Sequence, residues 1–229
     1  SDFASLGARH GLDVHARLRP ASEIGGDLYD VFETPDGRLC LAIGDVAGKG
    51  MPAALVMAVT RTAVRAAMER TKRPDAALAN ANRVLCSDNP QATFVTLFLG
   101  IWDGATGRLV HANAGHLPPL VSSHSLWRRA PIPANIALGI DPDARFEAGE
   151  IVLSPNDVLL TYSDGVTEAA SAMKVLFGPA RLESVVGRAN AESAAAVVQA
   201  VEQAVDGFAA GATQADELTL LCLRRPAEA

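Results

Sequence analysis

The fold is decided by two segments, Glu23-Ile-Gly-Gly-Asp-Leu-Tyr-Asp-Val-Phe32 and Leu41-Ala-Ile-Gly-Asp-Val-Ala-Gly-Lys-Gly50. Strand-forming residues predominate over 28–33 and 39–46, and the intervening Thr34-Pro-Asp-Gly37 has the composition of a turn. This pattern predicts a β-hairpin.

The hairpin places two carboxylates face to face. A turn centred on Asp36 sets Asp27 opposite Asp45, within one residue of register. Opposed residues on antiparallel strands lie about 4.5–5.5 Å apart, and like charges there are destabilising. A compensating charge is therefore needed. A divalent cation is the natural candidate, because hard cations bind carboxylate, carbonyl and water oxygens.

Composition limits the possible functions. The chain has 229 residues, 49% of them hydrophobic, so it can bury a sizeable core as one large domain or two small ones. Its net charge of −6 argues against general nucleic-acid binding. No apolar run approaches the ~20 residues that span a bilayer, and the start does not resemble a signal peptide. The isolated cysteines 40, 86 and 222 favour a reducing, cytoplasmic compartment. A start without methionine suggests a fragment of a longer protein.

Periodicity and turn signals predict the remaining elements. We assign residues 1–11 to the end of an upstream linker or helix and 12–226 to one domain. Strands are expected at about 12–19, 93–102, 108–114, 146–153, 157–163 and 217–224, and helices at about 51–70, 74–85, 179–187 and 192–210.

Several of these strands are apolar on both faces and therefore need cover on both sides. Short connections favour antiparallel pairing, and the helices come as an early and a late pair. We therefore expect an α+β fold, a four-layer α-β-β-α sandwich. The apolar face of the first long helix is predicted to run through Leu55, Val59, Ala63 and Ala66. That of the last is predicted through Val197, Val201, Val205 and Phe208.

Two further aspartates share the placement of Asp27 and Asp45. Asp164 follows the apolar run Val158-Leu-Leu-Thr-Tyr-Ser163, and Asp216 immediately precedes the last strand. A lone ionised carboxylate beside an apolar run is costly unless it is paired. Most aspartates at strand ends are turn residues or caps, but four such positions together favour a metal site.

An ordered set of motifs then resembles those of the PPM-type, metal-dependent protein serine/threonine phosphatases, in particular the bacterial SpoIIE/RsbU-like branch. The resemblance extends from about residue 12 to 224. Its motifs are Glu23-Ile-Gly-Gly-Asp-Leu-Tyr-Asp30, Ile43-Gly-Asp-Val-Ala-Gly-Lys-Gly-Met-Pro-Ala-Ala-Leu55, Asn113-Ala-Gly-His-Leu-Pro-Pro119, Leu159-Leu-Thr-Tyr-Ser-Asp-Gly-Val-Thr-Glu-Ala169 and Asp216-Glu-Leu-Thr-Leu-Leu221.

The resemblance implies a two-metal site that binds Mn²⁺ or Mg²⁺. By position, Asp45 would bridge the ions, with Asp27 and the Val46 carbonyl on one ion and Asp164 and Asp216 on the other. A water activated by both ions would attack phosphorus without a phospho-enzyme.

Some motif positions differ from those of certain family members outside this branch. Ala47 stands where those members carry a histidine, and Ser22 and Glu23 stand where they carry a phosphate-binding arginine, with Arg19 only nearby. The last motif reads Asp216-Glu217, and its first residue is the expected ligand.

Three other features have simpler interpretations. His116 is a possible proton donor, but a hydrogen bond to the turn before Pro118 is preferred. Lys49 is a possible phosphate contact or a solvated loop residue. The Gly44 to Lys49 segment resembles a Walker loop only superficially, because its spacing is too short and Gly50 replaces the Ser or Thr.

The expected activity is hydrolysis of phosphoserine or phosphothreonine on a regulatory protein. The resemblance points to an anti-sigma-factor antagonist with a STAS domain as substrate, to an upstream sensor domain, and to a possible homodimer. Movement of the 51–70 helix is a possible regulatory step, because the hairpin leads directly into it. The alternative function is a pseudophosphatase that binds phosphoproteins with little or no turnover.

Overall fold

The computed structural model describes residues 3–21, 25–87, 89, 92–123 and 126–227. The chain forms two compact units, each discontinuous in sequence. The hairpin unit comprises residues 22–116 and 131–152, and the terminal unit comprises 1–21, 117–130 and 153–229.

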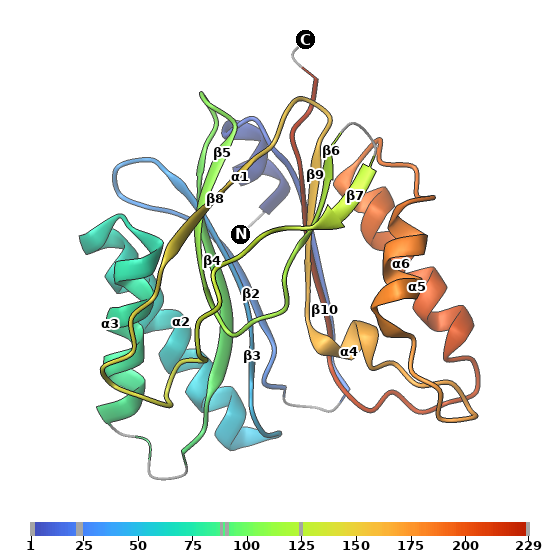
Figure 1. Cartoon of the computed structure of the whole chain (residues 1–229), viewed down its shortest axis with the longest axis horizontal. Coiled ribbons are helices and arrows are strands. Elements are labelled where there is room, and N and C mark those ends of the chain that lie inside the picture. The colour runs from blue at the N-terminus through green and yellow to red at the C-terminus, as the bar shows by residue number, and fades with distance from the viewer. Residues whose placement is uncertain (1–2, 22–24, 88, 90–91, 124–125, 228–229) are drawn as a thin grey trace. The chain divides into compact units, whose positions relative to one another are not determined.

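The hairpin unit is a five-stranded antiparallel sheet with two helices on one face (Figure 1). The strand order is β2-β3-β4-β5-β8. The bounds are β2 Leu28–Glu33, β3 Leu39–Val46, α2 Met51–Thr71, α3 Pro74–Ser87, β4 Val95–Asp103, β5 Arg108–Ala114 and β8 Ala148–Val152.

The predicted hairpin is confirmed in both bounds and register. Leu28 pairs with Gly44 and Glu33 with Leu39, so the turn is centred on Asp36. The Thr34 hydroxyl donates to Asp36 at 2.7 Å, and the Thr34 amide donates to the Arg38 carbonyl at 2.9 Å. Local turn chemistry therefore fixes which residues of β2 and β3 oppose one another.

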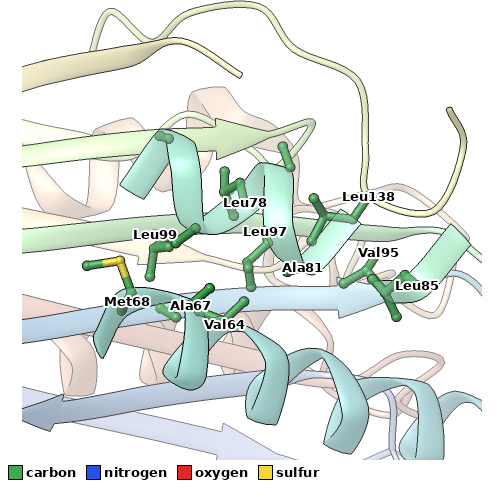
Figure 2. Packing of buried hydrophobic residues seen from close by; sticks show 14 of the residues in the cluster. Val64, Ala67, Met68, Leu78, Ala81, Leu85, Val95, Leu97, Leu99 and Leu138 are labelled. Carbon is green, nitrogen blue, oxygen red and sulfur yellow. The ribbon is translucent and has the colours of Figure 1, made fainter. Parts of the chain in front are cut away.

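Helix α2 buries a different face from the one expected. Leu55 and Val59 are 60% and 48% exposed, so the predicted stripe faces outward. The buried face consists of Ala53, Met57, Thr60, Val64, Ala67 and Met68. Figure 2 shows Val64, Ala67 and Met68 packed with residues of α3 and β4. Alanine is common on all sides of this helix, so its apolar pattern does not single out one stripe.

The terminal unit contains the second five-stranded antiparallel sheet, in the order β1-β10-β9-β6-β7. The bounds are α1 Phe3–Arg9, β1 Asp13–Arg19, β6 Leu120–Ser123, β7 Leu126–Arg129, β9 Val158–Tyr162, α4 Asp164–Thr167, α5 Gly178–Val186, α6 Ala194–Phe208 and β10 Leu218–Arg224. The predicted face of α6 is confirmed by burial of Val197, Val201 and Val205.

Two features of the sheets differ from a simple series of hairpins. The short strands β6 and β7 have no counterpart among the predicted elements. Strands β8 and β9 are adjacent in sequence but belong to different sheets, since β8 pairs with β5 while β9 pairs with β10 and β6. Among the described residues, no helix has the length and apolar character that crossing a membrane requires.

Candidate metal centre

The hairpin unit brings Asp27, Asp45 and Val46 together. Asp27 directly precedes β2, and extending the Leu28–Gly44 register by one residue sets it opposite Asp45. A Cβ built on Gly26 would lie 3.3 Å from the Val46 carbonyl oxygen, so the backbone before Asp27 passes close to that oxygen. Both aspartates are half-buried. Two carboxylates and one carbonyl thus share the open end of the hairpin.

The terminal unit brings Asp164 and Asp216 to neighbouring backbone. Ser163 fixes the approach of the two segments: its amide donates to the Thr219 carbonyl at 3.0 Å, and its hydroxyl donates to the Glu217 carbonyl at 3.3 Å. The Thr219 amide donates back to the Ser163 hydroxyl at 3.1 Å. Asp164 follows this clamp and begins α4.

Gly165 makes this approach possible. A Cβ at this position would overlap the carbonyl oxygen of Glu217, and it would lie 3.5 Å from the carbonyl carbon of Asp216. The glycine after Asp164 is therefore required by the backbone that carries Asp216. Asp164 and Asp216 are both half-buried.

The donors of each unit suit a hard divalent cation. They are carboxylate and carbonyl oxygens, the ligand type that Mg²⁺ and Mn²⁺ prefer. In the part of the chain that the structure describes, no three His, Cys, Asp or Glu side chains form a group that could hold a metal ion. Each unit by itself therefore offers a pair of aspartates and not a complete ligand set.

His116 is connected to the hairpin end through Thr96. Its ring Nδ1 lies 2.9 Å from the Thr96 hydroxyl, and that hydroxyl lies 3.4 Å from the Asp45 carbonyl oxygen. The expectation for this residue was a bond to the turn; the described ring contact is instead to a side chain of β4. Lys49 is exposed in the loop before α2.

The residues considered for phosphate binding divide into two groups. Arg19 Nη1 lies 2.6 Å from Asp206 Oδ1, so this guanidinium is engaged with α6. Ser22 and Glu23 fall outside the described residues.

Sequence reasoning missed the clamp that ties the hairpin to α2. Asp30, only 2% exposed, accepts paired hydrogen bonds from Arg65 at 2.6 and 2.6 Å and from Arg61 at 3.1 and 3.2 Å. Burial would raise the pKa of Asp30, but the bonds from Arg65 and Arg61 outweigh burial and lower it below its usual value. The spacing of Arg61 and Arg65, one helical turn apart, is the signal that could have found the clamp.

Comparison with known proteins gives a family and several relatives. The family model described as Stage II sporulation protein E (SpoIIE) matches residues 35–226. Protein IcfG of Synechocystis sp. is 28% identical over 93% of this chain and 38% of its own length. Phosphoserine phosphatase RsbU of Bacillus subtilis is 32% identical over 69% of this chain and 47% of its own length. The chain thus spans less than half of these curated relatives.

Solved structures show the same fold. The SiaA-PP2C domain of Pseudomonas aeruginosa is similar with a TM-score of 0.83 at 21% identity, covering 97% of this chain and 87% of that one. A structure of RsbX in complex with magnesium has a TM-score of 0.66 at 14% identity, covering 93% and 94% of the two chains. The α+β sandwich class predicted from the sequence is thereby confirmed.

Proposed function

Because the chain belongs to the SpoIIE family, within the SpoIIE/RsbU-like branch of the PPM-type phosphatases, we propose that it hydrolyses phosphoserine or phosphothreonine on a regulatory protein. The observation that carries the proposal is the pair of half-buried aspartates in each unit, each held at a strand end by backbone geometry. RsbU, which matches 69% of this chain, is named a phosphoserine phosphatase.

The proposed ligands are those expected from the sequence. Asp27 and the Val46 carbonyl would hold one divalent cation, Asp164 and Asp216 a second, and Asp45 both. The magnesium in the RsbX structure supports a divalent cation in this fold; the presence of two ions, and Mn²⁺ or Mg²⁺ as their identity, belong to the proposal. When bound, two such ions would supply an acidified water and stabilise charge on the phosphoryl group.

The chain's own residues would bind and orient. The proposal assigns the aspartates to metal binding and not to attack on phosphorus, and the Ala47 side chain has no proton to give to the leaving oxygen. Because Arg19 is paired with Asp206, we assign phosphate binding chiefly to the metal centre.

The substrate and setting are also part of the proposal. The family resemblance favours a phosphorylated STAS-domain protein as substrate and an upstream regulatory domain in a longer chain. Residues 12–226 as one catalytic domain, the cytoplasmic location and a homodimer remain predictions.

The decisive experiment compares Asp45→Asn with Asp143→Asn, which changes an exposed aspartate of the same unit. Turnover of p-nitrophenyl phosphate with Mn²⁺, and its loss with EDTA, are expected for the starting protein and for Asp143→Asn. Asp45→Asn should lose turnover and Mn²⁺ binding while remaining folded, because it removes a ligand and also relieves charge repulsion. Full activity in Asp45→Asn would exclude it from the mechanism. A folded starting protein without metal-dependent turnover would favour the pseudophosphatase alternative.

A further inference from the structure

The end of β3 has a hydrogen-bonded support on the neighbouring strand. Thr96 of β4 is the direct cross-strand partner of Asp45. Partners in an antiparallel pair point to the same face, so the Thr96 side chain stands beside that of Asp45. The Thr96 hydroxyl also lies 3.4 Å from the Asp45 main-chain oxygen. Thr96 therefore contacts the backbone that leads to the Val46 carbonyl.

The His116 ring holds the Thr96 hydroxyl in place. His116 is 5% exposed, and its Nδ1 lies 2.9 Å from Thr96 Oγ1. A threonine hydroxyl has one proton to donate. When that proton points at the Asp45 carbonyl, the second contact requires a protonated Nδ1 that donates to Oγ1. The order of donation is then His116 to Thr96 to Asp45.

The backbone of the turn that carries His116 is held by several contacts. Gly115 has a φ of 68°, and a Cβ there would lie 3.1 Å from the Ala137 amide nitrogen, so a side chain would be strained in conformation and crowded by the backbone of Ala137. Asn113 Nδ2 donates to the His116 carbonyl at 3.0 Å, and Asn135 Nδ2 donates to the Asn113 carbonyl at 2.9 Å. The motif Asn113-Ala-Gly-His116 thus acts as a bracket for one imidazole.

We propose that Thr96 and His116 are positioning residues, which hold the Asp45 backbone so that the Asp45 carboxylate and the Val46 carbonyl keep the spacing that a metal ion requires. This inference rests on the proposed function, because it takes Asp45 and Val46 as ligands. Partners that orient ligands in this way typically change metal affinity by about 10–100-fold. Neither residue contacts substrate in this assignment.

The test measures Mn²⁺ affinity by calorimetry on EDTA-treated protein, beside the melting temperature of the same metal-free samples. Thr96→Val keeps the shape of the side chain and removes the hydroxyl, while Thr96→Ser keeps the hydroxyl. We expect Thr96→Val and His116→Ala each to raise the Mn²⁺ Kd about tenfold. Thr96→Ser should leave the Kd near that of the starting protein. The Kd of the double variant should be no higher than that of the weaker-binding single variant. His116→Asn, which places an amide near the position of Nδ1, should recover part of the affinity.

The experiment separates failure of the positioning role from failure of the proposed metal site. If Asp45→Asn loses Mn²⁺ binding while Thr96→Val and His116→Ala bind as the starting protein does, the positioning role is wrong and the proposed site stands. If Asp45→Asn itself keeps Mn²⁺ affinity, the proposed site is wrong. Multiplicative losses in the double variant, or equal losses in Thr96→Val and Thr96→Ser, would also overturn the inference. Should His116→Ala fail to fold, the Thr96 pair of variants decides.

Discussion

The two aspartate pairs are positioned by different physical means. Asp27 and Asp45 owe their spacing to a ladder of backbone hydrogen bonds that starts from a tight turn. Asp164 and Asp216 owe theirs to contact between two backbone segments with no room for a side chain at Gly165. The first arrangement depends on strand register, which is compatible with many different side chains. The second depends on a single missing methyl group, so the terminal-unit pair should be the more sensitive to mutation.

Their surroundings differ in charge as well. The strand that follows Asp27 carries Asp30, which binds two arginines of α2. Arg65 also lies over the Phe32 ring, with its guanidinium carbon 4.6 Å from the ring centroid. The hairpin pair is thus linked to a helix by charge, whereas hydrogen bonds from the Ser163 amide and hydroxyl to backbone carbonyls hold the other pair. The stability of the hairpin unit should therefore depend on pH, and that of the terminal unit on side-chain volume next to Asp164.

The largest expected effect is that of Gly165→Ala. The added methyl overlaps the Glu217 carbonyl, and relieving it requires backbone movement on both segments, so we expect about 3 kcal/mol or more of lost stability in urea unfolding. Gly207→Ala is the matched control, because a Cβ there meets open space within α6. It should stabilise by about 0.5–1 kcal/mol. Equal effects at the two glycines would remove the contrast between the aspartate pairs.

A pH effect should follow from His111, which lies fully buried on β5. Burial lowers the pKa of His111 to about 4, and neither ring nitrogen has a hydrogen-bond partner among the described residues. Since the unfolded histidine binds its proton near pH 6.5, stability should be complete above that pH and fall by about 3 kcal/mol as pH drops to 4.

Unfolding at pH 7 and pH 4.5 checks this expectation. His111→Leu should reduce the difference between the two pH values. His15→Leu, which alters an exposed histidine of β1, should leave it unchanged. An undiminished pH difference in His111→Leu would show that another group titrates.

Asp30→Asn should have a smaller effect, about 2 kcal/mol at pH 7. Removing one member of a buried ion pair commonly destabilises a protein by more than this. Here the side chains of Arg61 and Arg65 are 47% and 38% exposed, so both can be solvated once the carboxylate is gone. Because the folded pKa of Asp30 is lowered, its contribution is present above about pH 4 and is lost as pH falls through the folded pKa.

Its matched control is Glu150→Gln, which breaks an exposed pair with Arg108 on the same sheet. That change should cost about 0–1 kcal/mol. Chemical unfolding at pH 7 compares the two variants, and a loss in Glu150→Gln as large as that in Asp30→Asn would contradict the importance of burial.

The smallest effect is expected on the outward face of α2. Val59→Ala should change stability by less than about 0.5 kcal/mol, because Val59 is 48% exposed. Val64→Ala should cost about 2 kcal/mol, because Val64 is 3% exposed and packs in the core. Thermal unfolding of the two variants measures the contrast, and the reverse order would restore the face predicted from the sequence.

Local signals in the sequence predicted local structure well. The β2–β3 hairpin follows from turn residues and alternation within a short stretch, so its bounds and register could be stated in advance. The α6 face was predictable because its valines form one stripe. The α2 face was not, because apolar residues lie on several sides of the helix and tertiary packing selects among them.

Features that depend on distant partners could not be read in the same way. Strand β7 has four mostly exposed residues and gives little periodic signal. The sequence between β8 and β9 resembles a hairpin turn. The two strands belong to different sheets because β8 pairs with β5 and β9 pairs with β10. For the site, the sequence identified the aspartates, but the Asp30 clamp and the Thr96–His116 contact join residues at least 20 positions apart.

Strand β1 pairs with β10 from Asp13–Arg224 to Arg19–Leu218. During synthesis β1 therefore waits for a partner that lies far downstream in the sequence, and β9 pairs with the other side of that partner. A nascent chain that stalls before Leu218 would carry two unsatisfied strand edges, which are templates for aggregation. The strand between β1 and β9 is thus made after both of its neighbours, so an interruption of synthesis between β9 and β10 exposes both edges at once.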